Sequence, residues 1–130
     1  MGPATGRVVF EYAVLRAVPR VDRGEFVNVG VLLYCQQRAF LDAAVRLSPD
    51  RLRALDPDVD VQGVEDALAG VQHGCRAEVA STAREGGGLG TVFRWLTAPR
   101  STVVQPGPVH SGLTDDPAAE LHRLLDRLVA

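Results

Sequence analysis

The residues with the clearest capacity for chemistry lie together in one short segment, Arg23-Gly24-Glu25-Phe26-Val27-Asn28-Val29-Gly30-Val31. A partly buried glutamate can act as a general acid or base, and arginine binds oxyanions through its planar fork of N–H groups. Asn28 and Gly30 are both unfavourable inside a β-strand, although the residues around them alternate as a strand does. The segment therefore combines candidate catalytic and binding residues with two breaks in strand preference.

Two interpretations of this segment are open. In the structural one, a β-bulge or a close helix crossing lies at Gly30, the Asn28 amide bonds a backbone group, and Glu25 pairs with an arginine. In the functional one, the backbone at Gly30 floors a polar pocket that Glu25, Asn28 and Arg16 line. The neighbouring Arg20 and Arg23 would then supply further positive charge for an anion.

Composition excludes several classes of function. The chain has 130 residues with a formal net charge of −2, and all 14 of its basic residues are arginine. Without lysine it has no P-loop, no kinase ATP-anchoring lysine and no Schiff-base chemistry. A net charge near zero also argues against broad affinity for nucleic acids.

No other motif in the sequence is specific enough to predict a metal-, nucleotide- or calcium-binding site. The three histidines have no second histidine or cysteine at ligand spacing, and the glycine-rich segment 86–91 does not match a dinucleotide-binding pattern. The acidic run 56–60 lacks the glycine and glutamate of a calcium loop, and helix capping explains it better. We therefore expect neither a metal nor a cofactor.

Hydrophobic periodicity predicts three strands followed mainly by helices. The period-two pattern covers residues 7–19, 26–35 and 39–47, and the short connections require an antiparallel meander. In the second strand, every other residue forms one unbroken apolar face, namely Val27, Val29, Val31, Leu33 and Cys35. Four helices are expected: one from Pro49 to before Pro57, one that starts near Asp60, one over 89–98 and one that starts at Pro117. A short strand over 102–105 is expected to precede a turn at 106–108.

The predicted fold is thus α+β: a three- to four-stranded antiparallel meander sheet with three to four helices packed on one face. We expect a single domain over residues 7–130 after a disordered lead-in over 1–6, because a chain of this size suits one core. No apolar stretch could span a membrane, and the N-terminus does not resemble a secretory signal. A cytoplasmic protein with Cys35 and Cys75 as free thiols is expected.

Several stretches of the chain resemble a bacterial family catalogued as domain of unknown function 3037. They are residues 12–16, 18–19, 23–31 and 100–106, with the Asp116-Pro117 opening of the last helix. The resemblance brings no established activity, but family members are often encoded beside a HipA-like kinase, which implies an accessory or partner role. On the matching positions it carries over Arg16, Glu25, Asn28 and Gly30, with Arg100 and Gln105 as a second cluster.

Three hypotheses follow. The leading one is a small accessory or binding module that pairs with another protein, such as a HipA-like kinase, or with a second copy through a sheet edge or Phe40. The second is a small enzyme that uses Glu25, with Arg16 or Arg100 holding an anion. The third is a weak arginine-based nucleic-acid binder that uses Arg16, Arg20, Arg23 and Arg100.

Overall fold

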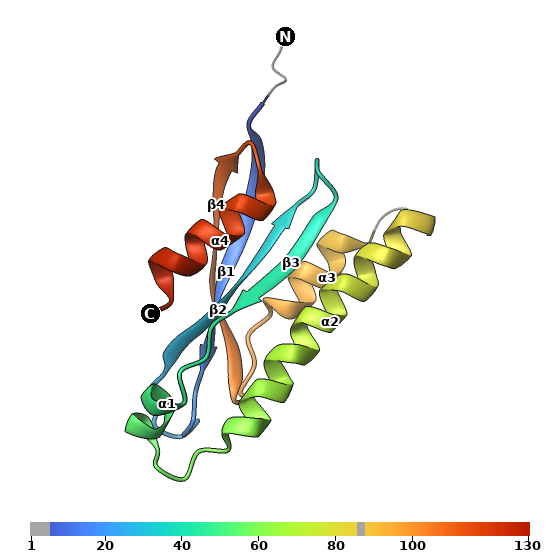
Figure 1. Ribbon diagram of the computed structural model, residues 1–130. Coiled ribbons are helices and arrows are strands. Elements are labelled where there is room, and N and C mark those ends of the chain that lie inside the picture. The colour runs from blue at the N-terminus through green and yellow to red at the C-terminus, as the bar shows by residue number, and fades with distance from the viewer. Residues whose placement is uncertain (1–5, 86–87) are drawn as a thin grey trace.

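A four-stranded antiparallel sheet forms the centre of the computed structural model, which describes residues 6–85 and 88–130 (Figure 1). The strand order is β3-β2-β1-β4, with β1 at Val8–Ala17, β2 at Val27–Cys35, β3 at Phe40–Val45 and β4 at Val104–Thr114. The helices found in these residues are α1 (Pro49–Leu55), α2 (Val61–Glu85), α3 (Leu89–Leu96) and α4 (Pro117–Leu128). The predicted α+β class and antiparallel sheet are confirmed.

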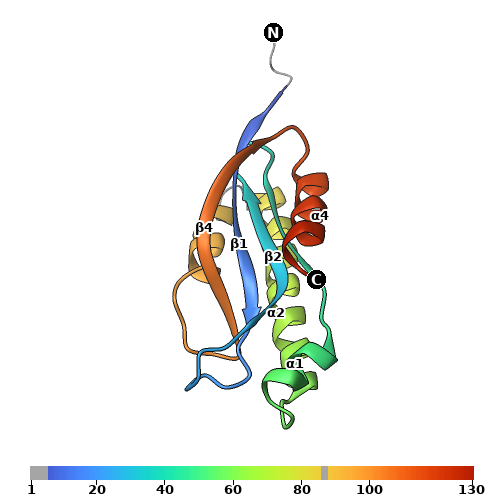
Figure 2. The ribbon, with the colours of Figure 1, turned by 90° about the vertical axis from the view of Figure 1, so that its left-hand side faces the viewer.

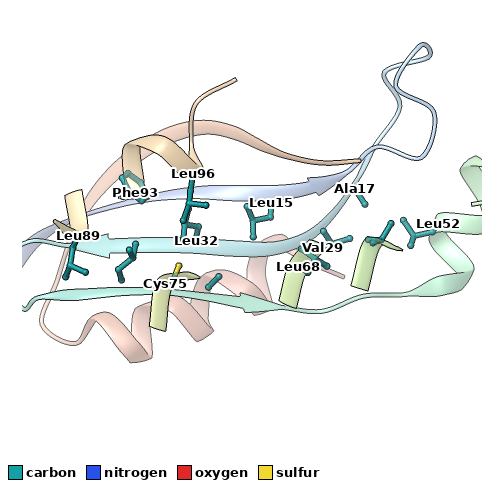
Figure 3. Close-up of a cluster of buried hydrophobic side chains, with 13 residues drawn as sticks. Leu15, Ala17, Val29, Leu32, Leu52, Leu68, Cys75, Leu89, Phe93 and Leu96 are labelled. Carbon is teal, nitrogen blue, oxygen red and sulfur yellow. The ribbon is translucent and has the colours of Figure 1, made fainter. Parts of the chain in front are cut away.

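The helices cover both faces of the sheet, so the prediction that they pack on one face is wrong (Figures 1 and 2). On one side, helices α1, α2 and α3 bury a cluster that includes Leu32, Leu52 and Phe93 (Figure 3). On the other side, α4 packs against Leu33 and its neighbours. Leu32 and Leu33 are both 0% exposed, and successive strand residues point to opposite faces, so both faces need an apolar cover.

A β-bulge in β2 changes which residues face each helix layer. Leu15 of β1 pairs with Gly30, but the next residue, Arg16, pairs with Asn28, so Val29 is the extra residue. Val29 consequently packs on the α2 side, whereas Val31 packs on the α4 side. The unbroken apolar face predicted for this strand is therefore wrong, and the bulge of the structural interpretation is confirmed.

Strand β4 is much longer than predicted, because the chain does not turn at 106–108. It pairs with β1 from Val104 to Thr114, and a register shift between Ala13 and Leu15 of β1 accommodates the extra length. Pro106 and Pro108 are tolerated because β4 lies at the edge of the sheet, where one side of the strand needs no donor. The prediction failed because Pro-Gly-Pro is usually a turn signal.

Side-chain caps begin two helices where the sequence predicts them. The Asp116 carboxylate accepts a 3.1 Å hydrogen bond from the Ala119 N–H at the start of α4, and Asp60 accepts one of 2.9 Å from the Gly63 N–H in α2. Helix α2 begins at Val61, close to the predicted start near Asp60, and continues to Glu85. Apart from residue 6, the predicted lead-in lies outside the described residues, and residues 86–87 of the glycine-rich segment do too.

None of the described helices combines the length and apolar character that crossing a membrane requires.

Candidate functional site

Three of the predicted site residues form one row across the sheet. Arg16 of β1 pairs with Asn28 of β2 on one side and with Gln105 of β4 on the other. Side chains of directly paired residues share a face and start about 5 Å apart. By alternation from Phe10, this row lies on the α4 side of the sheet. Strand pairing thus brings together three polar side chains that are far apart in sequence.

The Arg16 guanidinium is held by two further residues. Its central carbon lies 4.2 Å from the centroid of the Phe26 ring, close enough for a cation–π interaction. A Cβ added to Gly107 would lie 3.1 Å from the same carbon, so glycine is what permits this close approach. We call Arg16, Phe26, Asn28, Gln105 and Gly107 the Arg16 site.

Arg16 is partly buried and has no hydrogen-bond or ion-pair partner among the described residues. Its Nε atom is inaccessible to solvent and unbonded. Leaving a buried donor unsatisfied costs roughly 1–3 kcal/mol, and more for a charged group. The amide nitrogens of its row neighbours donate elsewhere: Asn28 to the Leu128 carbonyl at 3.0 Å, and Gln105 to the Thr102 carbonyl at 2.8 Å. An external acceptor can therefore reach Arg16 only through its Nη groups, because the Nε–H has no solvent access.

The charged loop before β2 is largely neutralised by its own ion pairs. Arg23 lies 2.9 Å from Glu25, and Arg20 lies 3.2 Å from Asp22, with all four side chains about half exposed or more. The hydrogen bond from Arg20, together with the guanidinium charge, lowers the pKa of the Asp22 carboxyl. The pairing of Glu25 with an arginine, expected in the structural interpretation, is confirmed, as is the bond from Asn28 to a backbone carbonyl.

Two predicted residues lie away from the Arg16 site. Because of the bulge, Gly30 faces the α2 side, where an added Cβ would lie 2.8 Å from the Ala44 carbonyl oxygen. It therefore floors no pocket shared with Asn28 and Arg16. Arg100 is directed to the end of α3: its Nη2 donates to the Trp95 carbonyl, and its guanidinium lies 4.8 Å from the Trp95 ring centroid. Gln105 belongs to the Arg16 row and not to a separate cluster with Arg100.

Phe26 and Gly107 are the site residues that sequence reasoning missed. Phe26 lies in the segment 23–31 described above. A single sequence does not show that an arginine of the neighbouring strand lies over its ring. For Gly107, the Pro-Gly-Pro pattern predicts a turn. The feature that could have identified it is a glycine between two prolines on a strand that pairs with β1. That pairing is known only from the strand register.

The side chains of the Arg16 site can bind a ligand but include no group that could catalyse a reaction. The site has one unpaired cation, one aromatic ring and two amide side chains, and these five residues include no carboxylate, histidine or nucleophile. Within the described ranges, no three His, Cys, Asp or Glu side chains gather as a metal ion would require.

Comparison with known proteins places the chain in a family. A family model described as "Protein of unknown function (DUF3037)" matches residues 12–129. The chain belongs to the DUF3037 family. The match confirms the resemblance drawn from the motifs and includes all five residues of the Arg16 site, but its description assigns no activity. No curated protein and no solved structure matches the chain.

Proposed function

We propose that this DUF3037 protein is a binding module, without catalytic chemistry of its own, that recognises a carboxylate of a partner protein at the Arg16 site. The observation that carries the proposal is the partly buried Arg16 guanidinium, packed by Phe26 and Gly107 and left without an acceptor. Binding a carboxylate would satisfy its Nη N–H groups, and charge-assisted bonds of this kind are about twice as strong as neutral ones.

Charge favours a carboxylate over a phosphate dianion at this site. Arg16 is its one cation, while the loop arginines Arg20 and Arg23 are paired with acidic side chains. A planar, singly charged carboxylate matches the fork of a single guanidinium. A phosphate dianion would bring two negative charges to a site that offers one cation.

Exposed apolar residues along β4 support a protein partner rather than a free small acid. Val9, Val109 and Leu113 are 58%, 43% and 56% exposed, with Val9 opposite Leu113 and Val109 opposite Ala13. By alternation along β1 they share the α2 side of the sheet, the face opposite Arg16. Apolar surface beside an unpaired sheet edge is typical of a site where another chain adds a strand. A strand added along the proline-free part of β4, residues 109–114, presents side chains to both faces of the sheet. One set would cover the apolar residues, and the other would lie on the face that carries the Arg16 site.

The partner that we propose is a HipA-like kinase. This part of the proposal depends on the family resemblance, since family members are often encoded beside such a kinase. A second copy of this chain is the competing occupant of β4, and the experiment below separates the two.

Co-expression with a HipA-like kinase encoded in the same genome, followed by size-exclusion chromatography, tests the partnership. We expect one peak that contains both chains, with Arg16→Gln shifting it to separate peaks. Arg51→Gln, which removes an exposed arginine of α1, is the matched control and should leave the complex intact. Separate elution of the two unaltered chains at micromolar concentration would reject the kinase, and a lone peak at twice the chain mass would favour the second copy.

Carboxylate recognition can be tested without the partner. Titration with acetate should shift the Arg16 Nε–Hε resonance in a saturable way, while chloride at the same ionic strength should not. Phosphate should compete more weakly than acetate. Equal shifts at every arginine, or no saturation at Arg16, would overturn the carboxylate proposal even if a protein complex forms.

A further inference from the structure

A groove of about 560 Å³ lies on the opposite side of the sheet from the Arg16 site. It is lined by the first half of α2 and by the segment that leads into β4. These two segments lie at the lower end of the molecule in Figure 1. Residues of the loop between α1 and α2 also line it. A groove of this size is within the range that binds ligands and peptide side chains.

Part of the groove lining is apolar and accessible. Ala67 on α2 is exposed and Val103, before β4, is 40% exposed, whereas Val64 is fully buried between them and the core. Because Ala67 is small, α2 projects little side chain into the groove at that position. Apolar surface of this kind gains free energy when a partner covers it, about 25 cal/mol for each Å² removed from water.

One rim of the groove is acidic. It carries Asp56, Asp58 and Asp60, of which Asp56 accepts a hydrogen bond from the Asp58 N–H and Asp60 accepts one from the Gly63 N–H. These bonds fix two of the carboxylates and leave their charge in place. The single lining cation, Arg100, is held against Trp95 by its bonds to the Ala98 and Trp95 carbonyls.

We propose that this groove binds a basic amphipathic helix of a partner protein. An apolar stripe on that helix would cover Ala67 and Val103, while lysine or arginine side chains beside the stripe would reach Asp58 and Asp60. The charge complementarity selects a basic segment, because an acidic one would meet three carboxylates. The proposal does not depend on carboxylate recognition at Arg16, which lies on the other face.

A designed leucine–lysine peptide, with leucines at helical spacing, is the probe, and its leucine–glutamate counterpart is the control peptide. We expect the lysine peptide to bind with an affinity that falls as salt is added, and the glutamate peptide to bind at least about tenfold more weakly. Amide resonances of α2 and of residues 102–104 should shift on binding. Shifts confined to other surfaces, or equal binding of both peptides, would overturn the proposal.

Two substitutions locate the binding in the groove. Ala67→Trp fills the space and should abolish binding, whereas Ala69→Trp adds the same side chain at an exposed position of the same helix outside the groove and should not. Asp58→Asn should lower the affinity for the lysine peptide about fivefold, as expected for the loss of an exposed ion pair. Asp115→Asn is its control, since Asp115 is exposed and away from the groove. Unchanged affinity in Ala67→Trp, with a native circular dichroism spectrum, would reject the groove as the binding site.

Discussion

The side-chain amide of Asn28 donates a 3.0 Å hydrogen bond to the main-chain carbonyl of Leu128, 100 residues later in the chain. Leu128 is the last residue of α4, where helix carbonyls have no partner within the helix. Arg46 completes the cap, with one nitrogen on the Val129 carbonyl at 3.1 Å and the other on the Asp126 carboxylate at 2.7 Å. A side chain from β2 and one from the residue that follows β3 thus cap the end of α4 and fix it on the sheet.

Asn28→Ala should therefore loosen α4 without disturbing the other face. We expect a loss of about 0.5–1.5 kcal/mol in the free energy of unfolding, the usual contribution of one such hydrogen bond. Urea unfolding measures the loss, and amide exchange should rise in α4 before it rises in α2. Gln37→Ala, at an exposed turn position, is the control. Unaltered exchange in α4 would show that the bond contributes little to holding the helix.

Gly30 should not tolerate even a methyl group. An added Cβ would lie 2.8 Å from the Ala44 carbonyl oxygen and 3.2 Å from Cγ1 of Val45, and a backbone carbonyl in a sheet cannot move aside cheaply. We expect Gly30→Ala to destabilise the protein by about 1–3 kcal/mol, the usual cost of overpacking a core. Thermal unfolding measures it.

Gly74→Ala is the opposite case and serves as the control for Gly30. Gly74 lies within α2, and an added Cβ there meets nothing within 4 Å. Alanine should stabilise the helix by about 0.5–1 kcal/mol, because it lowers the backbone entropy lost on folding. If both substitutions changed stability by the same amount, the close packing over Gly30 would be the wrong explanation.

Local signals in the sequence predicted the strands β1 to β3, the capped start of α4 and the breaks at Asn28 and Gly30. Each depends on neighbours within a few residues, such as the period of two before Pro19 or the Asp116-Pro117 cap. The bulge, the two-sided helix cover and the Arg16 row depend on strand register instead. Register is set by which residues meet across β1, β2 and β4, and a single sequence carries that information only weakly.

Gly107 should be coupled energetically to Arg16. A Cβ at position 107 would lie 3.1–3.2 Å from three atoms of the guanidinium, so Gly107→Ala forces that group to move. We expect the substitution to cost about 1 kcal/mol in the native protein but only about 0.3 kcal/mol in an Arg16→Ala background, where the crowding is gone. A double-mutant cycle in urea measures the coupling. Additive costs would mean that Arg16 does not lie against Gly107 in solution.

Cys75 should make the protein less stable at high pH. Burial, followed by the nearby charge of Asp42, raises the pKa of its thiol from 9.0 to about 12. Between these two values the unfolded chain has lost the thiol proton and the folded chain still holds it. The unfolded state therefore binds fewer protons, and stability falls as pH rises through that window, by up to about 1 kcal/mol per pH unit.

The absence of lysine makes the contribution of Cys75 to the pH dependence of stability easier to measure. Lysine ordinarily titrates near pH 10.4, within the same window, and the chain has none. Urea unfolding at several pH values between 7 and 11 should show the decline above about pH 9 in the unaltered protein. In Cys75→Ala the decline should be shallower, although its stability at pH 7 will be lower because a buried side chain has been cut back. Parallel curves for the two proteins would show that the Cys75 thiol ionises as readily in the folded chain as in the unfolded one.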